Sequence, residues 1–187
     1  MEKRPRVQWS RTARACLLLT CLALPCIALA QQVPAAIRAA ILLRSLSYEK
    51  GFAAGTGPAT VLVLSGSNGT SDGNETAASM KKLATSGGST RQLRVETSSS
   101  DASAAEAKRT KAQVVYVASG NERALSELSE LHHIIVLCGD PAGIGKGCVL
   151  SVEVSGTSSR LVIDLARATK LGLQLDARIL RLARVVR

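Results

Sequence analysis

Short apolar runs alternate with amphipathic stretches along most of this chain. The runs over 60–64, 113–118 and 133–138 are apolar almost throughout, have the length of one strand, and are bounded by polar residues or glycine. Runs of this kind are typical of strands buried on both faces of a parallel sheet. A weaker run covers 92–97. The pattern therefore predicts a parallel sheet whose first strands are these four segments.

The segments between the strands carry apolar residues at helical spacing. The first, 33–46, has Pro34 near its start, a position that suits proline, and glycines and Pro58 follow it. Regular alternation of strands and helices with short connections places helices on both faces of the sheet. The other predicted helices are 75–84, 102–111, 122–131, 166–171 and 177–186.

The alternation of strands and helices changes after residue 148. Two runs of strand length, 149–154 and 161–165, are separated by Gly156, Thr157 and Ser158, which is typical of a hairpin. The predicted fold class is therefore α/β, a three-layer sandwich with a mostly parallel sheet, an antiparallel hairpin at one edge and flanking helices.

The first 30 residues differ from the rest of the chain in their pattern of charged and apolar residues. Five basic residues precede an apolar run over 15–29 that ends Ala-Leu-Ala. A charged start, an apolar run and a small-x-small exit predict a cleavable signal peptide over 1–30, with cleavage between Ala30 and Gln31. Residues 31–187 then form one domain located in the periplasm.

Two alternatives to a cleaved leader stay open. An uncleaved membrane anchor is disfavoured because the run has about 15 residues where about 20 are needed to span a bilayer, and because Pro25 breaks the helix. A lipoprotein is disfavoured because Thr20 and Pro25, which are not small enough for a lipid-attachment signal, precede Cys21 and Cys26, and because the apolar run has barely begun at Cys16.

The formal net charge is +10, and five of the 24 basic residues lie in the leader. After residue 30 the aromatic residues are Tyr48, Phe52 and Tyr116, which is too few for base stacking, so no nucleic-acid partner is predicted. Basic residues outnumber acids over 160–187. Such a tail favours an acidic partner or anionic lipid, or it solvates a helix face.

Cys138 and Cys148 are the two cysteines that remain after cleavage. An even pair in an exported protein indicates a disulfide, and the glycines between the two give the chain the freedom to close a small ring. Two buried free thiols are the alternative. A metal site needs further ligands, and because His132 and His133 are adjacent in an extended segment, at most one of them can join the sulfurs.

Several segments resemble catalytic motifs only in part. A phosphate-binding loop over 140–146 would need glycine at Asp140, Ser or Thr at Gly147 and a helix afterwards, whereas a strand is predicted there. The serines have no accompanying base, and no Gly-x-Ser-x-Gly elbow is present. We therefore predict no catalytic residue, no metal site and no cofactor.

The C-terminal half resembles the YfiR-like family of small exported proteins. That family has an apolar strand ending in Ile-Asn, an alanine two turns on, Gly-Leu, and a closing Leu-Leu-x-Leu-Ala. This chain departs by having Leu161 in place of an aromatic residue and Asp164 in place of Asn, and it lacks the aromatic-Pro element after the first helix. The matching positions are Ile163, Asp164, Ala168, Gly172, Leu173, Leu180, Leu182 and Ala183.

The resemblance implies a non-enzymatic periplasmic regulator. Its best-known form binds the periplasmic part of an inner-membrane diguanylate cyclase and represses it, so that cyclic di-GMP output falls. The resemblance also implies a homodimer and an intramolecular disulfide, for which Cys138 and Cys148 are suitably placed. Reduction of that bond would loosen the loop between them, which predicts a redox-responsive regulator.

A second hypothesis is a periplasmic small-molecule binding module related to solute-binding proteins. The polar, glycine-rich segments 65–68 and 119–121 follow predicted strands, where ligands of α/β sheets bind. The scarcity of aromatic residues weakens this hypothesis, because sugar and amino-acid pockets commonly use rings. An exported hydrolase would need a base near one of the serines, which the sequence does not reveal.

Overall fold

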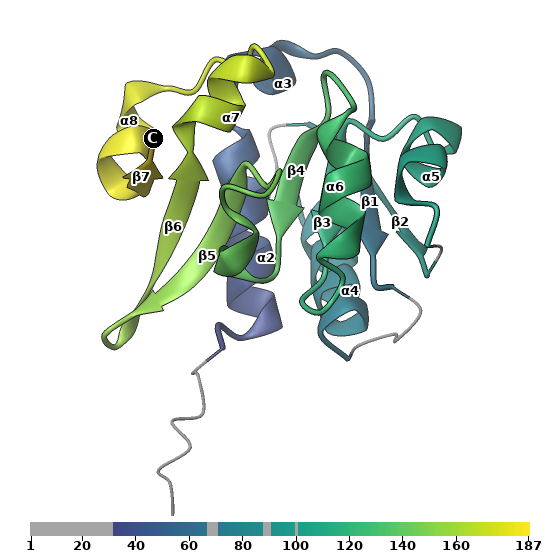
Figure 1. Ribbon diagram of the computed structural model, residues 1–187, viewed down its shortest axis with the longest axis horizontal. Coiled ribbons are helices and arrows are strands. Elements are labelled where there is room, and N and C mark those ends of the chain that lie inside the picture. The colour runs from purple at the N-terminus through teal and green to yellow at the C-terminus, as the bar shows by residue number, and fades with distance from the viewer. Residues whose placement is uncertain (1–31, 67–70, 88–90, 100) are drawn as a thin grey trace, which may run out of the picture. The chain divides into compact units, whose positions relative to one another are not determined.

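The computed structural model describes residues 32–66, 71–87, 91–99 and 101–187, so the predicted signal peptide and its cleavage point lie outside the described residues. A seven-stranded sheet runs through the domain in the order β2-β1-β3-β4-β5-β6-β7 (Figure 1). Its strands are β1 (Ala59–Leu64), β2 (Leu93–Ser98), β3 (Val114–Val117), β4 (Ile135–Cys138), β5 (Leu150–Ser155), β6 (Ser158–Asp164) and β7 (Arg184–Val186).

The first five strands of the sheet run parallel to one another. Every residue of β3 and β4 is buried, and β1 is buried except at Thr60. Since the side chains of a strand alternate between faces, both faces of these strands must be covered. The prediction of an α/β fold with a mostly parallel sheet is confirmed.

Helices cover the two faces of the sheet. α2 (Ala35–Leu46) and α4 (Ser71–Thr85) pack on one face, where Leu42 and Met80 lie in the larger core. α5 (Ser103–Arg109) and α6 (Arg123–Ser129) pack on the other face, with Leu125 and Leu128 in the smaller core. Figure 1 shows α2 and α4 behind the sheet and α6 in front of it. Within the described ranges, no helix combines the length and apolar character that crossing a bilayer requires.

The sheet changes direction at the hairpin of β5 and β6, which pair antiparallel as predicted. The helix predicted over 177–186 is wrong in its second half, because α8 (Ala177–Leu182) ends and β7 then pairs in parallel with β6. Val185 and Val186 are β-branched and suit a strand, yet Val186 lies seven residues after Ile179, a spacing that also fits a helix. Apolar spacing alone therefore did not separate the two structures, and β7, not the hairpin, forms this edge.

A short helix, α3 (Lys50–Ala54), was not predicted, because Gly51 and Gly55 indicated a loop. The buried carboxylate of Glu49 accepts hydrogen bonds from the backbone N–H of Phe52 and of Gln174, the latter at 2.9 Å. Glu49 thus caps α3 and ties it to the segment that leads into α8. α7 (Leu165–Lys170) follows β6 and completes the helices of the C-terminal part.

Candidate functional site

The carboxyl ends of β1 and β3 form the topological switch point of the sheet. After β1 the chain crosses to β2 at the edge and then returns to β3 on the other side of β1. Ligands of open α/β sheets bind at such points. Ser65 and Gly66 follow β1, and a Cβ added at Gly66 would lie 3.0 Å from Cγ of Asn121, which follows β3. The two predicted segments therefore meet, although Ser67 and Asn68 lie outside the described residues.

Asp72, in the first turn of α4, reaches into this switch point. Its Oδ2 accepts hydrogen bonds from the backbone N–H of Ser119 (3.2 Å) and from the hydroxyl of Tyr116 (3.4 Å). The other oxygen, Oδ1, accepts from the guanidinium of Arg38. The carboxylate of Asp72 therefore accepts hydrogen bonds from donors that would otherwise face a ligand.

Arg38 comes from the neighbouring helix, α2, and is only 3% exposed. Besides its ion pair with Asp72, it donates from Nη1 to the backbone carbonyl of Gly139 at 3.2 Å. Gly139 directly follows β4, and a Cβ there would come within 2.6 Å of the Tyr116 hydroxyl oxygen. The pair therefore joins α2, α4 and the end of β4 in one buried polar network.

A small cavity at the carboxyl ends of β3 and β4, lined among others by Val117, Leu125 and Cys138, has a volume of about 10 Å³, room for one water molecule at most. Within the part of the chain that the structure describes, no three or more His, Cys, Asp or Glu side chains are placed together as metal ligands.

Tyr116 makes the network sensitive to alkaline pH. Burial of its fully covered side chain raises the pKa from 10.0 to about 12, although the nearby charge of Arg38 acts in the opposite direction. In the unfolded chain the hydroxyl loses its proton first, so the native state is fully favoured below pH 10 and loses stability as the pH rises towards 12. We expect this loss to reach roughly 2 kcal/mol.

The measurement is urea unfolding as a function of pH for the wild type and Tyr116→Phe. The variant loses hydrogen bonds to Asp72 and Thr76 at every pH, but its stability should fall less steeply between pH 10 and 12. Tyr48→Phe removes a tyrosine hydroxyl on a different part of the domain and is the matched control. Equal slopes of stability against pH for the wild type and Tyr116→Phe would contradict a raised pKa of Tyr116.

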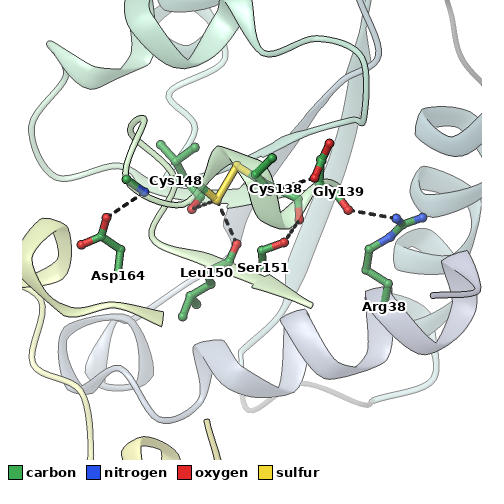
Figure 2. Close-up of a disulfide and its surroundings, with 11 residues drawn as sticks. Arg38, Cys138, Gly139, Cys148, Leu150, Ser151 and Asp164 are labelled. Carbon is green, nitrogen blue, oxygen red and sulfur yellow. Dashed lines mark hydrogen bonds between the residues drawn. A yellow bond between two sulfur atoms is a disulfide. The ribbon is translucent and has the colours of Figure 1, made fainter. Parts of the chain in front are cut away.

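Cys138 and Cys148 form a disulfide, which confirms the prediction and excludes the pair of free thiols (Figure 2). The bond joins the end of β4 to the residue two positions before β5, with Cα atoms 6.0 Å apart, within the usual range for such bonds. The loop begins with a short 3₁₀ turn, Pro141–Gly143, which is capped by the carboxylate of Asp140 accepting from the N–H of Ala142 at 2.8 Å.

The disulfide is buried under α6. Both cysteines are almost fully covered, and the loop glycines pack against Leu125 of that helix. A Cβ at Gly143 would lie 2.9 Å from Sγ of Cys138, and one at Gly147 would lie 3.0 Å from the carbonyl oxygen of Leu125. The glycines therefore allow close packing of the ring as well as its closure.

Two polar contacts surround the bond. The buried hydroxyl of Ser151 donates to the carbonyl of Cys138 at 3.0 Å, and Sγ of Cys148 lies 3.1 Å from the carbonyl oxygen of Leu150 (Figure 2). A disulfide sulfur carries no proton, so the second contact is a hydrogen bond only in the reduced protein. Reduced Cys148 would therefore find an acceptor already in place.

Asp164 ties the loop to the C-terminal part. Its Oδ1 caps α7 by accepting from the N–H of Arg167 (2.8 Å), and its Oδ2 accepts from the N–H of Gly145 (3.1 Å). A carboxylate can accept on both oxygens, whereas the amide of Asn would direct N–H groups at one of these donors. The Asp at this position is thus suited to hold the disulfide loop.

Most of the remaining motif positions lie in the larger core or pack against it. Ile163, Ala168 and Ala183 are buried in the larger core, Leu173 and Leu180 pack against it, and Gly172 has a φ of +72° that favours glycine. Leu182 differs from them, because its side chain is 72% exposed.

The sequence analysis missed Arg38, Asp72 and Ser151. A signal existed for Arg38, since it lies in the buried stripe of α2 beside Ala39 and Leu42, where a charge requires a partner. Asp72 is an acidic residue in the first turn of a helix, and Ser151 lies in a buried strand. Both patterns are common, so neither singles out a partner.

A protein-family model described as YfiR/HmsC-like matches residues 35–184. A comparison with curated protein sequences finds no match. The match covers nearly all the described elements, including α2, the disulfide loop and the C-terminal motif positions up to Ala183.

Similar solved structures include a conserved domain protein from Vibrio cholerae O1 biovar El Tor, at 14% identity and a TM-score of 0.57, covering 80% of this chain and 60% of that one. The ABC domain in complex with L-Trp from Streptococcus pneumonia has 16% identity, a TM-score of 0.57 and coverages of 82% and 62%. The ligand-free, open structure of a substrate-binding protein with adhesive properties from Clostridium difficile has 13% identity, a TM-score of 0.53 and coverages of 76% and 58%. These likenesses show a shared fold, and the chain spans about three fifths of these structures' length.

Proposed function

The chain belongs to the YfiR/HmsC-like family, whose model matches residues 35–184, and from this premise we propose that it is a periplasmic regulator without enzymatic activity. Family membership implies regulatory protein binding. The partner in our proposal is an inner-membrane signalling protein, a diguanylate cyclase. The regulator binds the periplasmic part of the cyclase and holds its output of cyclic di-GMP low.

The observation that carries this proposal, beside the family match, is the buried ion pair at the switch point of the sheet. The buried pair of Arg38 and Asp72 occupies the place where a solute-binding fold would receive its ligand. A domain whose ligand site is filled by its own side chains is better suited to binding through its surface. The small-molecule binding module is therefore the second candidate, supported by the fold of the similar structures.

A periplasmic location is supported by the predicted signal peptide and by the disulfide, since such bonds persist in oxidising compartments. The bond also gives the regulator a redox response. Because it is buried, a reductant reaches it only when the loop over 139–147 opens. The response would therefore be slow. Homodimerisation stays a prediction, to be measured by light scattering of the purified chain.

The experiment measures cyclic di-GMP in cells that produce a diguanylate cyclase with a periplasmic part, with and without this chain, together with capture of that cyclase on the immobilised chain. We expect capture and a fall in cyclic di-GMP, both altered in Cys138→Ser/Cys148→Ser. Failure of capture and of repression, combined with a thermal shift on adding a small solute such as an amino acid, would favour the binding module.

A further inference from the structure

An apolar groove of about 320 Å³ lies between α2, β6 and α8. Leu161 and Ile179, which are nearly buried, line it together with Ile41 of α2 and with Tyr48, two residues beyond that helix, and Leu182 of α8 stands at its rim. In the described part of the chain, Leu182 and Ile37 are the large apolar side chains that are exposed, at 72% and 48%. Leu182 lines the groove, and Ile37 lies one turn before Ile41 on α2, so it extends the apolar surface along that helix.

Helix α2 therefore has two apolar stripes. The first, with Leu42 and Leu46, packs into the larger core. The second consists of Ile37 and Ile41, one turn apart, of which Ile41 lines the groove. An exposed apolar stripe that continues across a second element is typical of a surface that binds a partner.

The charges around the groove have one sign. Arg44 and Arg160 line the groove, and Arg181 directly precedes its rim residue Leu182 in α8. Among the described residues these three arginines form no ion pair, whereas the neighbouring Arg178 and Arg184 are paired with Asp176 and Glu153. No carboxylate lines the groove. The surface thus combines an apolar floor with unpaired guanidinium groups at its rim.

We propose that this groove binds an acidic amphipathic segment of the regulated protein, a proposal that rests on the function proposed above. Apolar side chains at helical spacing fill the groove, and Asp or Glu residues beside them pair with Arg44, Arg160 and Arg181. A second copy of this chain fits poorly, because a symmetric contact through this face would set the arginines against one another. The concave floor also suits an inserted segment better than a flat lipid surface.

The first test uses the purified chain with its disulfide intact and a fluorescent synthetic helix with Leu at i, i+3, i+4 and i+7 and Glu on both flanks. We expect binding that weakens with salt. Arg44→Glu/Arg160→Glu/Arg181→Glu and, separately, Leu182→Asp should each weaken it about tenfold or more. Thermal unfolding verifies that these surface variants fold.

The matched control is Lys81→Glu/Lys108→Glu/Arg123→Glu, which changes the net charge equally at exposed positions on α4, α5 and the start of α6. It should bind almost as well as the wild type. The proposal is overturned if the acidic helix does not bind, if the groove variants bind like the control, or if a scrambled peptide binds equally. Binding to phosphatidylglycerol vesicles in place of the peptide would also overturn it, in favour of a lipid surface.

The second test separates this proposal from the proposed function. In cells with the cyclase, repression by the wild type and the control, but not by the groove variants, supports both. Repression by all of them leaves the function standing and overturns the groove. If the wild type itself does not repress, the proposed function fails, and the peptide measurement alone decides on the groove.

Discussion

Asp72→Ala is expected to lower the free energy of unfolding by about 3–5 kcal/mol, because it leaves the charge of Arg38 buried without its partner. Arg38 is 3% exposed, and its Nε has no hydrogen-bond partner among the described residues. In the described part of the chain, the acceptor left to Arg38 would be the carbonyl of Gly139. The N–H of Ser119 would lose its acceptor as well. Urea unfolding measures the loss.

The reverse change provides the control. Arg38→Met should cost less, about 1–3 kcal/mol, because Asp72 is more exposed than Arg38 and keeps its bonds to Ser119 and Tyr116. The double variant Arg38→Met/Asp72→Ala should be more stable than Asp72→Ala alone, since no buried charge remains. Equal and small losses for both single variants, under about 1 kcal/mol, would mean that the pair is solvated.

Cys138→Ser/Cys148→Ser is expected to lower the free energy of unfolding by about 3 kcal/mol. The cysteines are 10 residues apart, and closing a ring of this size restricts the unfolded chain by about that amount in the chain-entropy model. The two buried hydroxyls add to the loss where they lack partners. Urea unfolding of the wild type with and without reductant should likewise show a lower free energy of unfolding for the reduced protein.

The burial of the disulfide also predicts how fast it is reduced in the native protein. Because both sulfurs are covered, a thiol reductant should reduce the native protein slowly, at the rate at which the loop opens. Mild urea should speed the reaction. Fast reduction of the native protein without denaturant, or equal stability of the oxidised and reduced forms, would argue against the structural role described here. Cys138→Ala/Cys148→Ala separates the loss of the bond from the burial of hydroxyls.

The sheet and its helical layers were predictable because continuous apolar runs and helical spacing record burial directly. The run 60–64 became β1, and the glycines after 138 correctly indicated a closed loop. The end of the chain was not predictable in this way, because Val186 satisfies the spacing of a helix while it lies in a strand. Pairing with β6 decided between the two, and that is a long-range effect.

The polar network shows a second limit. Arg38 and Asp72 are 34 positions apart and meet only because α2 and α4 pack on the same face. A single sequence records that each residue is charged but not which partner it meets. The groove has the same limit, since Ile41, Leu161 and Ile179 come from three elements that only the fold brings together.

The two edges of the sheet restrict how any partner can attach. β7 has three residues, and β2, at the other edge, carries the ion pair of Arg94 and Glu96. Short strands and charged side chains at an edge discourage another chain from adding a strand. Recognition by backbone pairing is therefore disfavoured on both sides, and so is edge-to-edge aggregation at high concentration. The protein must therefore recognise its partner through side-chain contacts.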